Sequence, residues 1–337
     1  METVEIETLD PSLAPVLLYN CGRGGADPEE GDDGARLVYS IPKKQLLLLA
    51  GGGEPDRFID DVNWVTAQGW MLTLDPATRS TSLRDPSSSR TIGLPPDTDD
   101  LLAGSDETRC VMSTRLPTDP GCVVLVVHLR DPVLCYCRPG PGDSRWLSHR
   151  YRPELLVTDD YFGRDDIIHA VANHTAAALG RFYTDWAEKL GTLEFSPGPT
   201  LAATHVEIRP LPPGCRCFNA RCLVESCGEL FMVLFMSTPL GNMKCLRIEV
   251  QKLEWSRNAW VKVMTLGSNR VFFVGEDQFG ASLPADKFGL KANCIYFCNN
   301  GDKCLYVYDM EKGSTAMHNP GPEIPDFLEP ILLMPAT

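Results

Sequence analysis

The sequence predicts an all-β protein, a β-propeller of about six or seven irregular blades with three to four strands each. Short apolar or alternating runs recur along the chain between glycine, proline, aspartate and asparagine, which is the pattern of strands joined by turns. These runs form clusters that repeat roughly every 45 to 70 residues, near the period of a propeller blade. Glycine (28) and proline (27) are both plentiful, as many turns require. Because no short motif recurs at a fixed offset, a β-sandwich or a two-domain all-β protein remains an alternative.

The expected strands follow one another along most of the chain. In the first half they cover residues 14–19, 35–41, 44–50, 69–75, 80–86, 90–95, 122–129, 132–138 and 144–149. In the second half they cover residues 220–226, 230–236, 244–254, 259–266, 269–275, 293–298 and 304–310. Paired strands are also expected around 180–185 and 189–195.

One segment, residues 165–180, has a different pattern. Ile167, Val171, Thr175 and Leu179 follow at intervals of four, and Gly180 could end a helix. The strands expected directly after it favour a continuous β structure instead. The sequence leaves this segment open between helix and strand.

The chain has 337 residues, enough for one large domain or two ordinary ones. We expect a short acidic extension at 1–13 and a single propeller domain at 14–337. The first ten residues carry four acids and have no apolar core, so they do not resemble a signal peptide. The longest apolar run, 230–236, is far shorter than the roughly 20 residues of a membrane-spanning helix.

The net charge of −14 makes nucleic acid or an anionic membrane an improbable partner. Acidic residues cluster at 27–33 and 97–107. Such clusters are usually solvated loop tips, and the alternative is a docking patch for a basic partner protein.

Thirteen cysteines in a chain with no export signal indicate a reducing compartment, so we expect a cytoplasmic or nuclear protein. Cys294, Cys298 and Cys304 lie within eleven positions, which raises the question of a metal site. On a strand, Cys294 and Cys298 share a face but lie about 13 Å apart, too far to bind one zinc ion. With no C-x-x-C motif and no suitable histidine nearby, we expect buried, reduced thiols and no bound metal.

Catalytic and cofactor-binding motifs are also missing. The chain has no G-x-S-x-G elbow, P-loop, H-E-x-x-H or dinucleotide-binding glycine motif, so we predict no catalytic, cofactor-binding or metal-binding residues. Adjacent acids such as Asp99 and Asp100 are more typical of turns than of acid–base catalysis. The six tryptophans are expected in the core, with one or two exposed as interface anchors: Trp64, Trp70, Trp146, Trp186, Trp255 and Trp260.

The C-terminal third resembles a known plant family, the domain of unknown function 295, described as an F-box-associated β-propeller. The resemblance lies in "CLVESCGELFMVLF" (222–235), "KLEWSRNAWVKVMTLGSNRVFFVG" (252–275) and "GLKANCIYFCNNGDKCLYVYDMEKGS" (289–314), with weaker similarity upstream from about residue 14. It implies a propeller that resembles the substrate-binding part of F-box ubiquitin-ligase adaptors.

The sequence departs from that family at its start. Many members begin with an F-box that binds the Skp1 adaptor, whereas only thirteen residues precede the first expected strand here. We therefore expect no F-box and no direct Skp1 binding. The predicted function is a non-catalytic, monomeric interaction module whose loop face binds another protein. The acidic loops favour a basic partner. The alternative is a propeller enzyme or small-molecule binder with a site in the central channel.

Overall fold

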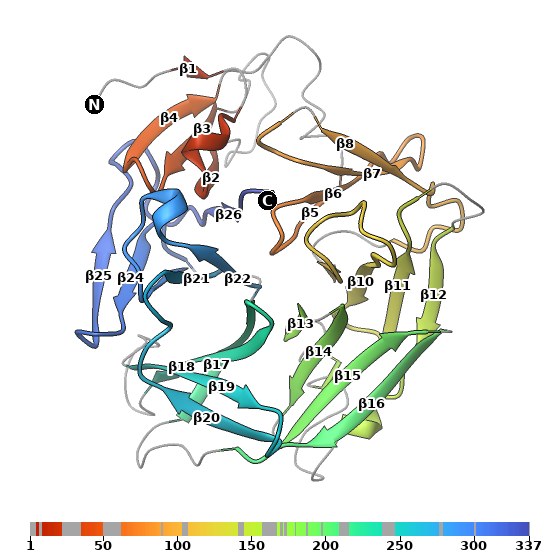
Figure 1. The fold of residues 1–337 in the computed structure, drawn as a ribbon. Helices are drawn as coiled ribbons and strands as arrows, with labels where there is room; N and C mark the ends of the chain where they lie inside the picture. The colour runs from red at the N-terminus through yellow and green to blue at the C-terminus, as the bar shows by residue number, and fades with distance from the viewer. Residues whose placement is uncertain are drawn as a thin grey trace.

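The structure is a computed structural model, and it describes most of the chain. The described residues are 5–6, 9–21, 35–49, 62–88, 90–102, 107–140, 145–156, 167–168, 171, 174–178, 180–186, 188–196, 198–208, 216–237, 247–275, 279–299 and 301–336. In this part of the chain, six small sheets stand in a ring around a central axis (Figure 1). The predicted β-propeller is confirmed, and it has six blades.

Each blade is a row of strands that runs from the axis outwards. The first blade contains β26 (Ile331–Leu333), β2 (Val16–Cys21), β3 (Ala35–Ser40), β4 (Gln45–Leu49) and β1 (Glu5–Ile6). The second contains β5 (Val62–Val65), β6 (Met71–Leu74), β7 (Thr81–Arg84) and β8 (Thr91–Leu94). The third contains β9 (Thr108–Met112), β10 (Val124–His128), β11 (Val133–Cys137) and β12 (Leu147–Arg150).

The other three blades follow in chain order around the ring. The fourth contains β13 (Thr175–Ala178), β14 (Arg181–Trp186), β15 (Lys189–Phe195) and β16 (Pro199–His205). The fifth contains β17 (Arg216–Ser226), β18 (Glu229–Ser237), β19 (Arg247–Glu254) and β20 (Ala259–Val263). The sixth contains β22 (Gly280–Pro284), β21 (Arg270–Val274), β23 (Cys294–Cys298), β24 (Leu305–Asp309) and β25 (Ser314–His318).

The two ends of the chain meet in the first blade. Strand β26 pairs antiparallel with β2, with Leu17 opposite Leu332, so the last strand completes the sheet that the first strands begin. Figure 1 shows blue β26 beside red β2 and β3. This pairing closes the ring by backbone hydrogen bonds.

The sixth blade departs from the simple up-and-down order. Strands β21 and β23 are parallel, because β22 and the short 3-10 turn η4 (Asp286–Phe288) lie between them in sequence. Strand β22 takes the inner position and packs against β17 of the fifth blade, where the hydroxyls of Ser226 and Ser282 are 2.8 Å apart. This contact brings two inner strands together with little room between them.

Six clusters of buried apolar side chains fill the spaces between neighbouring blades. Strand β10 shows how the sequence produces them. Val124 and Val126 pack toward the second blade, whereas Leu125 and Val127 pack toward the fourth. A blade has a neighbour on each side, so both faces of a central strand are buried and its sequence is continuously apolar. The same reason explains residues 230–236 of β18.

The segment that the sequence left open divides into two parts. Ile167, Ile168 and Val171 have helical backbone, and Thr175–Ala178 form strand β13. The remaining positions of 165–173 and residue 179 lie outside the described residues. Among the described residues, no helix is long and apolar enough to span a membrane.

Candidate functional site

The inner strands surround a small cavity at the centre of the ring. Its volume is about 50 Å³, and its lining includes residues of β9, β13 and β22. Pockets that bind drug-sized ligands usually measure roughly 300 to 1,000 Å³. The cavity that the described residues line is therefore smaller than the pockets of such ligands.

One end of this cavity is crossed by an ion pair. Arg115 of the third blade and Glu225 of the fifth blade approach to 3.5 Å, although the fourth blade lies between their blades in the ring. Gln68 of the second blade lines the same end and donates a hydrogen bond of 3.1 Å to the carbonyl of Met112. Polar side chains from three blades thus narrow the channel on this side.

The acidic segment 97–107 joins the second blade to the third, and its aspartates differ sharply in exposure. Asp97 is fully buried, while the side chain of Asp100 is 85% exposed. Asp99 and Glu107 are also exposed. For this acidic segment the sequence predicted either solvated loop tips or a docking patch. Both predictions are wrong for Asp97, because its carboxylate is buried, and the sequence analysis missed its structural role.

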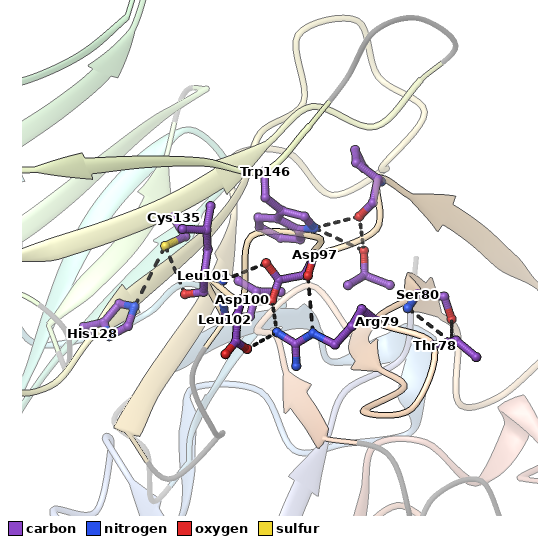
Figure 2. Close-up of polar contacts among 12 residues, drawn as sticks. Thr78, Arg79, Ser80, Asp97, Asp100, Leu101, Leu102, His128, Cys135 and Trp146 are labelled. Atoms are coloured by element: carbon purple, nitrogen blue, oxygen red, sulfur yellow. Dashed lines mark hydrogen bonds and ion pairs between the residues drawn. The ribbon is translucent and has the colours of Figure 1, made fainter.

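The Asp97 carboxylate holds the loop in place (Figure 2). It accepts hydrogen bonds from the backbone amides of Leu101 at 2.8 Å and Leu102 at 3.0 Å, and from the guanidinium of Arg79. Arg79 also contacts the carboxylate of Asp100. A buried carboxylate is stable when it is fully hydrogen-bonded, so these bonds fix the backbone of residues 97–102. The acids that remain exposed are therefore presented on a rigid support.

The same corner of the molecule joins the two blades through Trp146 (Figure 2). Its indole nitrogen, on the third blade, donates to the carbonyl of Pro95 at 2.8 Å and lies 3.2 Å from the hydroxyl of Thr81. The thiol of Cys135 lies 3.4 Å from the carbonyl of Leu101 and 3.9 Å from His128. These contacts fix the position of the loop relative to both blades.

The buried cysteines of the described residues have thiols of low reactivity. Burial and, to a smaller extent, the nearby Asp97 carboxylate raise the pKa of the Cys135 thiol to about 11. Burial likewise raises the pKa of Cys304 to about 11 and raises the pKa values of Cys110, Cys122, Cys137, Cys222 and Cys294. A thiol with a raised pKa is protonated at neutral pH and is a poor nucleophile and metal ligand.

Strand β23 places its cysteines as the alternation of a strand requires. Cys294 and Tyr296 pack toward the first blade, and Ile295 and Phe297 pack toward the fifth. In the described part of the chain, no three His, Cys, Asp or Glu side chains are grouped so that they could hold a metal ion.

The tryptophans divide as the sequence predicted. Trp64, Trp70, Trp146 and Trp260 are buried between blades, and Trp255 is 43% exposed in the turn after β19. The side chain of Trp186 lies outside the described residues, as does the acidic segment 27–33.

A family model described as the KIB1-4 beta-propeller matches residues 38–314. It confirms a β-propeller family for this sequence, while the specific resemblance to the domain of unknown function 295 stays a prediction. Among curated proteins, none matches the chain.

The solved structures that match this chain are distant in sequence. A protein from Lactobacillus plantarum is 11% identical with a TM-score of 0.38, covering 90% of this chain and 81% of that one. A member of the DUF4221 family from Bacteroides vulgatus is 8% identical with a TM-score of 0.38, covering 98% and 94% of the two chains. A quinoprotein alcohol dehydrogenase-like protein from Bacteroides thetaiotaomicron is 8% identical with a TM-score of 0.34, covering 91% of this chain and 61% of that one.

Proposed function

The chain belongs to the KIB1-4 β-propeller family, and from this we propose that it is a non-catalytic interaction module whose loop face binds another protein. We further propose that this module is related to the substrate-binding part of F-box ubiquitin-ligase adaptors. The sequence resemblance over 222–314 supports this relation. We also propose that it works in the cytoplasm or nucleus, in keeping with its free, buried thiols.

The observation that carries this proposal is the loop held by Asp97. Buried hydrogen bonds fix its backbone, and the carboxylates of Asp99 and Asp100 remain outside. A preorganised loop binds with a smaller loss of conformational entropy than a loop that must first be ordered. Binding surfaces are commonly built from such loops on a rigid scaffold.

The charge of the loop favours a basic partner. Exposed carboxylates attract a positively charged surface over about a Debye length, which is roughly 8 Å at physiological salt. The expected signature is an association rate that falls as the salt concentration rises.

Affinity purification from plant extract, followed by mass spectrometry, tests the proposal. The wild-type chain should recover a reproducible protein partner with a basic surface. The variant with Asp99→Lys and Asp100→Lys should recover much less of it. The variant with Asp286→Lys and Glu311→Lys, at exposed sites on the sixth blade, serves as the charge-matched control. The absence of any reproducible partner would count against an interaction function.

A further inference from the structure

We propose that a groove along residues 319–326 is the docking site for a basic segment of the partner, one that carries an arginine beside an apolar side chain. This inference rests on the proposed function and adds a surface and a partner chemistry to it. The groove lies in the connection from β25, the outer strand of the last blade, to β26, the inner strand of the first. The Asp97 loop is the equivalent connection from β8 to β9, so both lie at the same end of the propeller.

The groove is a formed feature of the surface. Its volume is about 520 Å³, and its walls include Pro322, Ile324 and Pro325. Proline fixes its own backbone φ angle, so these walls lose little entropy when a ligand binds. The groove is open to solvent along its length, so it suits an extended peptide segment that lies across the surface better than an enclosed small molecule.

Lys303 holds the groove from beneath. Its Nζ donates to the carbonyls of Gly321 at 3.0 Å and Ile324 at 2.6 Å, and the hydroxyl of Tyr19 donates to the Lys303 carbonyl at 2.6 Å. The Lys303 side chain is only 5% exposed, whereas Asp326, its ion-pair partner at 2.8 Å, is 94% exposed. The ammonium therefore supports the groove, and a carboxylate faces the solvent.

The rim of the groove is acidic. Asp326 and Glu323 are both exposed, and the Glu323 carboxylate lies beside Gly321 in the groove wall. Two more carboxylates bind the adjacent backbone. Asp302 accepts a hydrogen bond from the amide of Cys304, and Glu329 accepts one from the amide of Gly301. These four carboxylates outweigh the one ammonium of Lys303, so the potential at this place favours a cationic ligand.

Exposed apolar side chains flank the same segment. Met317 is 61% exposed, Phe327 is 77% exposed and Ile331 is 40% exposed. They are three of the eight large apolar side chains exposed in the described part of the chain, and all three lie within residues 317–331. Met317 lies on the outer strand β25 and Ile331 on the inner strand β26, so Phe327, which directly follows Asp326 of the groove, is the exposed apolar side chain of interest here. Aromatic side chains are enriched at protein-binding surfaces.

The acidic rim and the exposed ring of Phe327 together favour a partner segment that contains an arginine. An arginine can place its guanidinium over the exposed ring of Phe327 and reach the carboxylate of Asp326, the next residue in the chain. An adjacent apolar side chain of the partner can then cover the walls formed by Pro322 and Pro325. An acidic segment would be repelled by the rim.

A peptide library tests this site directly. Fluorescein-labelled hexapeptide pools, each with one position fixed as Arg, Lys, Leu, Phe, Asp or Ser, are titrated with the full chain by fluorescence anisotropy. Pools fixed as Arg, Lys, Leu or Phe should bind above the Ser pools, and Asp pools should bind below them. The inference is overturned if no pool binds better than the Ser pools.

The best peptide is then measured against variants. Phe327→Ala, and Glu323→Gln combined with Asp326→Asn, should each weaken binding about tenfold, as loss of a central contact does. Met264→Ala and Asp131→Asn, at exposed sites on other blades, should leave affinity unchanged. The melting temperatures of the variants show whether they fold as the wild type does. If folded groove variants bind the peptide with wild-type affinity, the peptide binds elsewhere and the proposed site is wrong.

A failure of the groove proposal can be distinguished from a failure of the proposed interaction function. A protein partner that the groove variants still recover at the wild-type level would remove the groove from the interface and leave the interaction function standing. A wild-type chain that recovers no partner would count against the function itself.

Discussion

Arg79 and Asp97 are joined by both their side chains and their backbones. The guanidinium of Arg79 meets the buried Asp97 carboxylate, its Nε lies 3.3 Å from the Asp97 carbonyl, and the amide of Asp97 donates to the Arg79 carbonyl at 2.9 Å. Arg79 has a positive φ of 59°, which turns the β6–β7 connection toward the loop. The pair ties the outer part of the second blade to the loop that enters the third.

Replacement of Asp97 by alanine should therefore destabilise the protein. The change removes the acceptor of the Leu101 and Leu102 amides and leaves the Arg79 guanidinium without its buried partner. We expect a loss of about 3 kcal/mol in the free energy of unfolding, as for other broken buried ion pairs. Urea denaturation measures it. The control is the exposed Asp99→Ala, which should change the free energy by less than about 0.5 kcal/mol.

Gly280 should not tolerate a side chain. An added Cβ would lie 2.3 Å from the carbonyl oxygen of Leu223 and 2.5 Å from Val224, because β22 and β17 approach closely at this point. Gly280→Ala should cost roughly 2 to 3 kcal/mol, as overpacking of a core does.

The matched control is Gly93→Ala on β8, where no atom lies within 4 Å of the added Cβ. Its alanine should be neutral or stabilising by up to about 1 kcal/mol. Similar melting temperatures for the two variants would contradict the close contact of the inner strands.

Thiol labelling should separate Cys227 from the buried cysteines. Cys227 is exposed in the turn between β17 and β18, whereas Cys110, Cys137 and Cys222 are buried and have raised pKa values. In the folded protein, iodoacetamide at pH 8 should modify Cys227 at least tenfold faster than these three. Peptide mass spectrometry reads the rates. Rapid modification of any of the three buried thiols would show that the blades do not pack as described.

Acid should weaken the contact between the fifth and sixth blades at Glu229. Hydrogen bonds from Arg270 at 2.8 Å and Lys252 at 3.0 Å lower the pKa of this carboxyl below its usual 4.5. A lowered pKa in the folded state gives stability that is present above the unfolded pKa and is lost as the pH falls through the folded pKa.

Because the pair is partly exposed and screened, we expect this contribution to be below about 1 kcal/mol. Glu229→Gln should lose correspondingly less stability than wild type between pH 7 and pH 3. Chemical denaturation at the two pH values measures the difference. Equal losses in the two proteins would show that the contact makes no contribution.

The sequence predicted the middle strands of the blades well and the inner strands poorly. Strands β10 and β18 are buried on both faces and therefore have long apolar runs that stand out. The inner strands β5, β9, β22 and β26 have three to five residues each and include polar or small ones such as Asn63, Arg109 and Ser282. They face a narrow channel, so the alternation that marks a strand is weak. Their order in the sheets depends on contacts between blades, which a local pattern does not contain.

The sequence determines local turns more directly than it determines the candidate site. Asp309 accepts hydrogen bonds from the amides of Glu311 and Lys312, and Gly313 has a positive φ of 63°, which the short spacing of aspartate and glycine favours. The burial of Asp97 was missed because its contacts with Arg79 join separate turns. The local sequence carries no signal for it, because almost any residues at 101 and 102 would offer the same backbone amides.

Closure of the ring by β26 is the central claim, and hydrogen–deuterium exchange tests it most directly. If Leu332 and Leu333 pair with β2 as described, peptides that cover 331–333 should exchange as slowly as those from the buried strand β10. Exchange of 331–333 within seconds, at the rate of an unstructured chain, would contradict a closed six-bladed propeller.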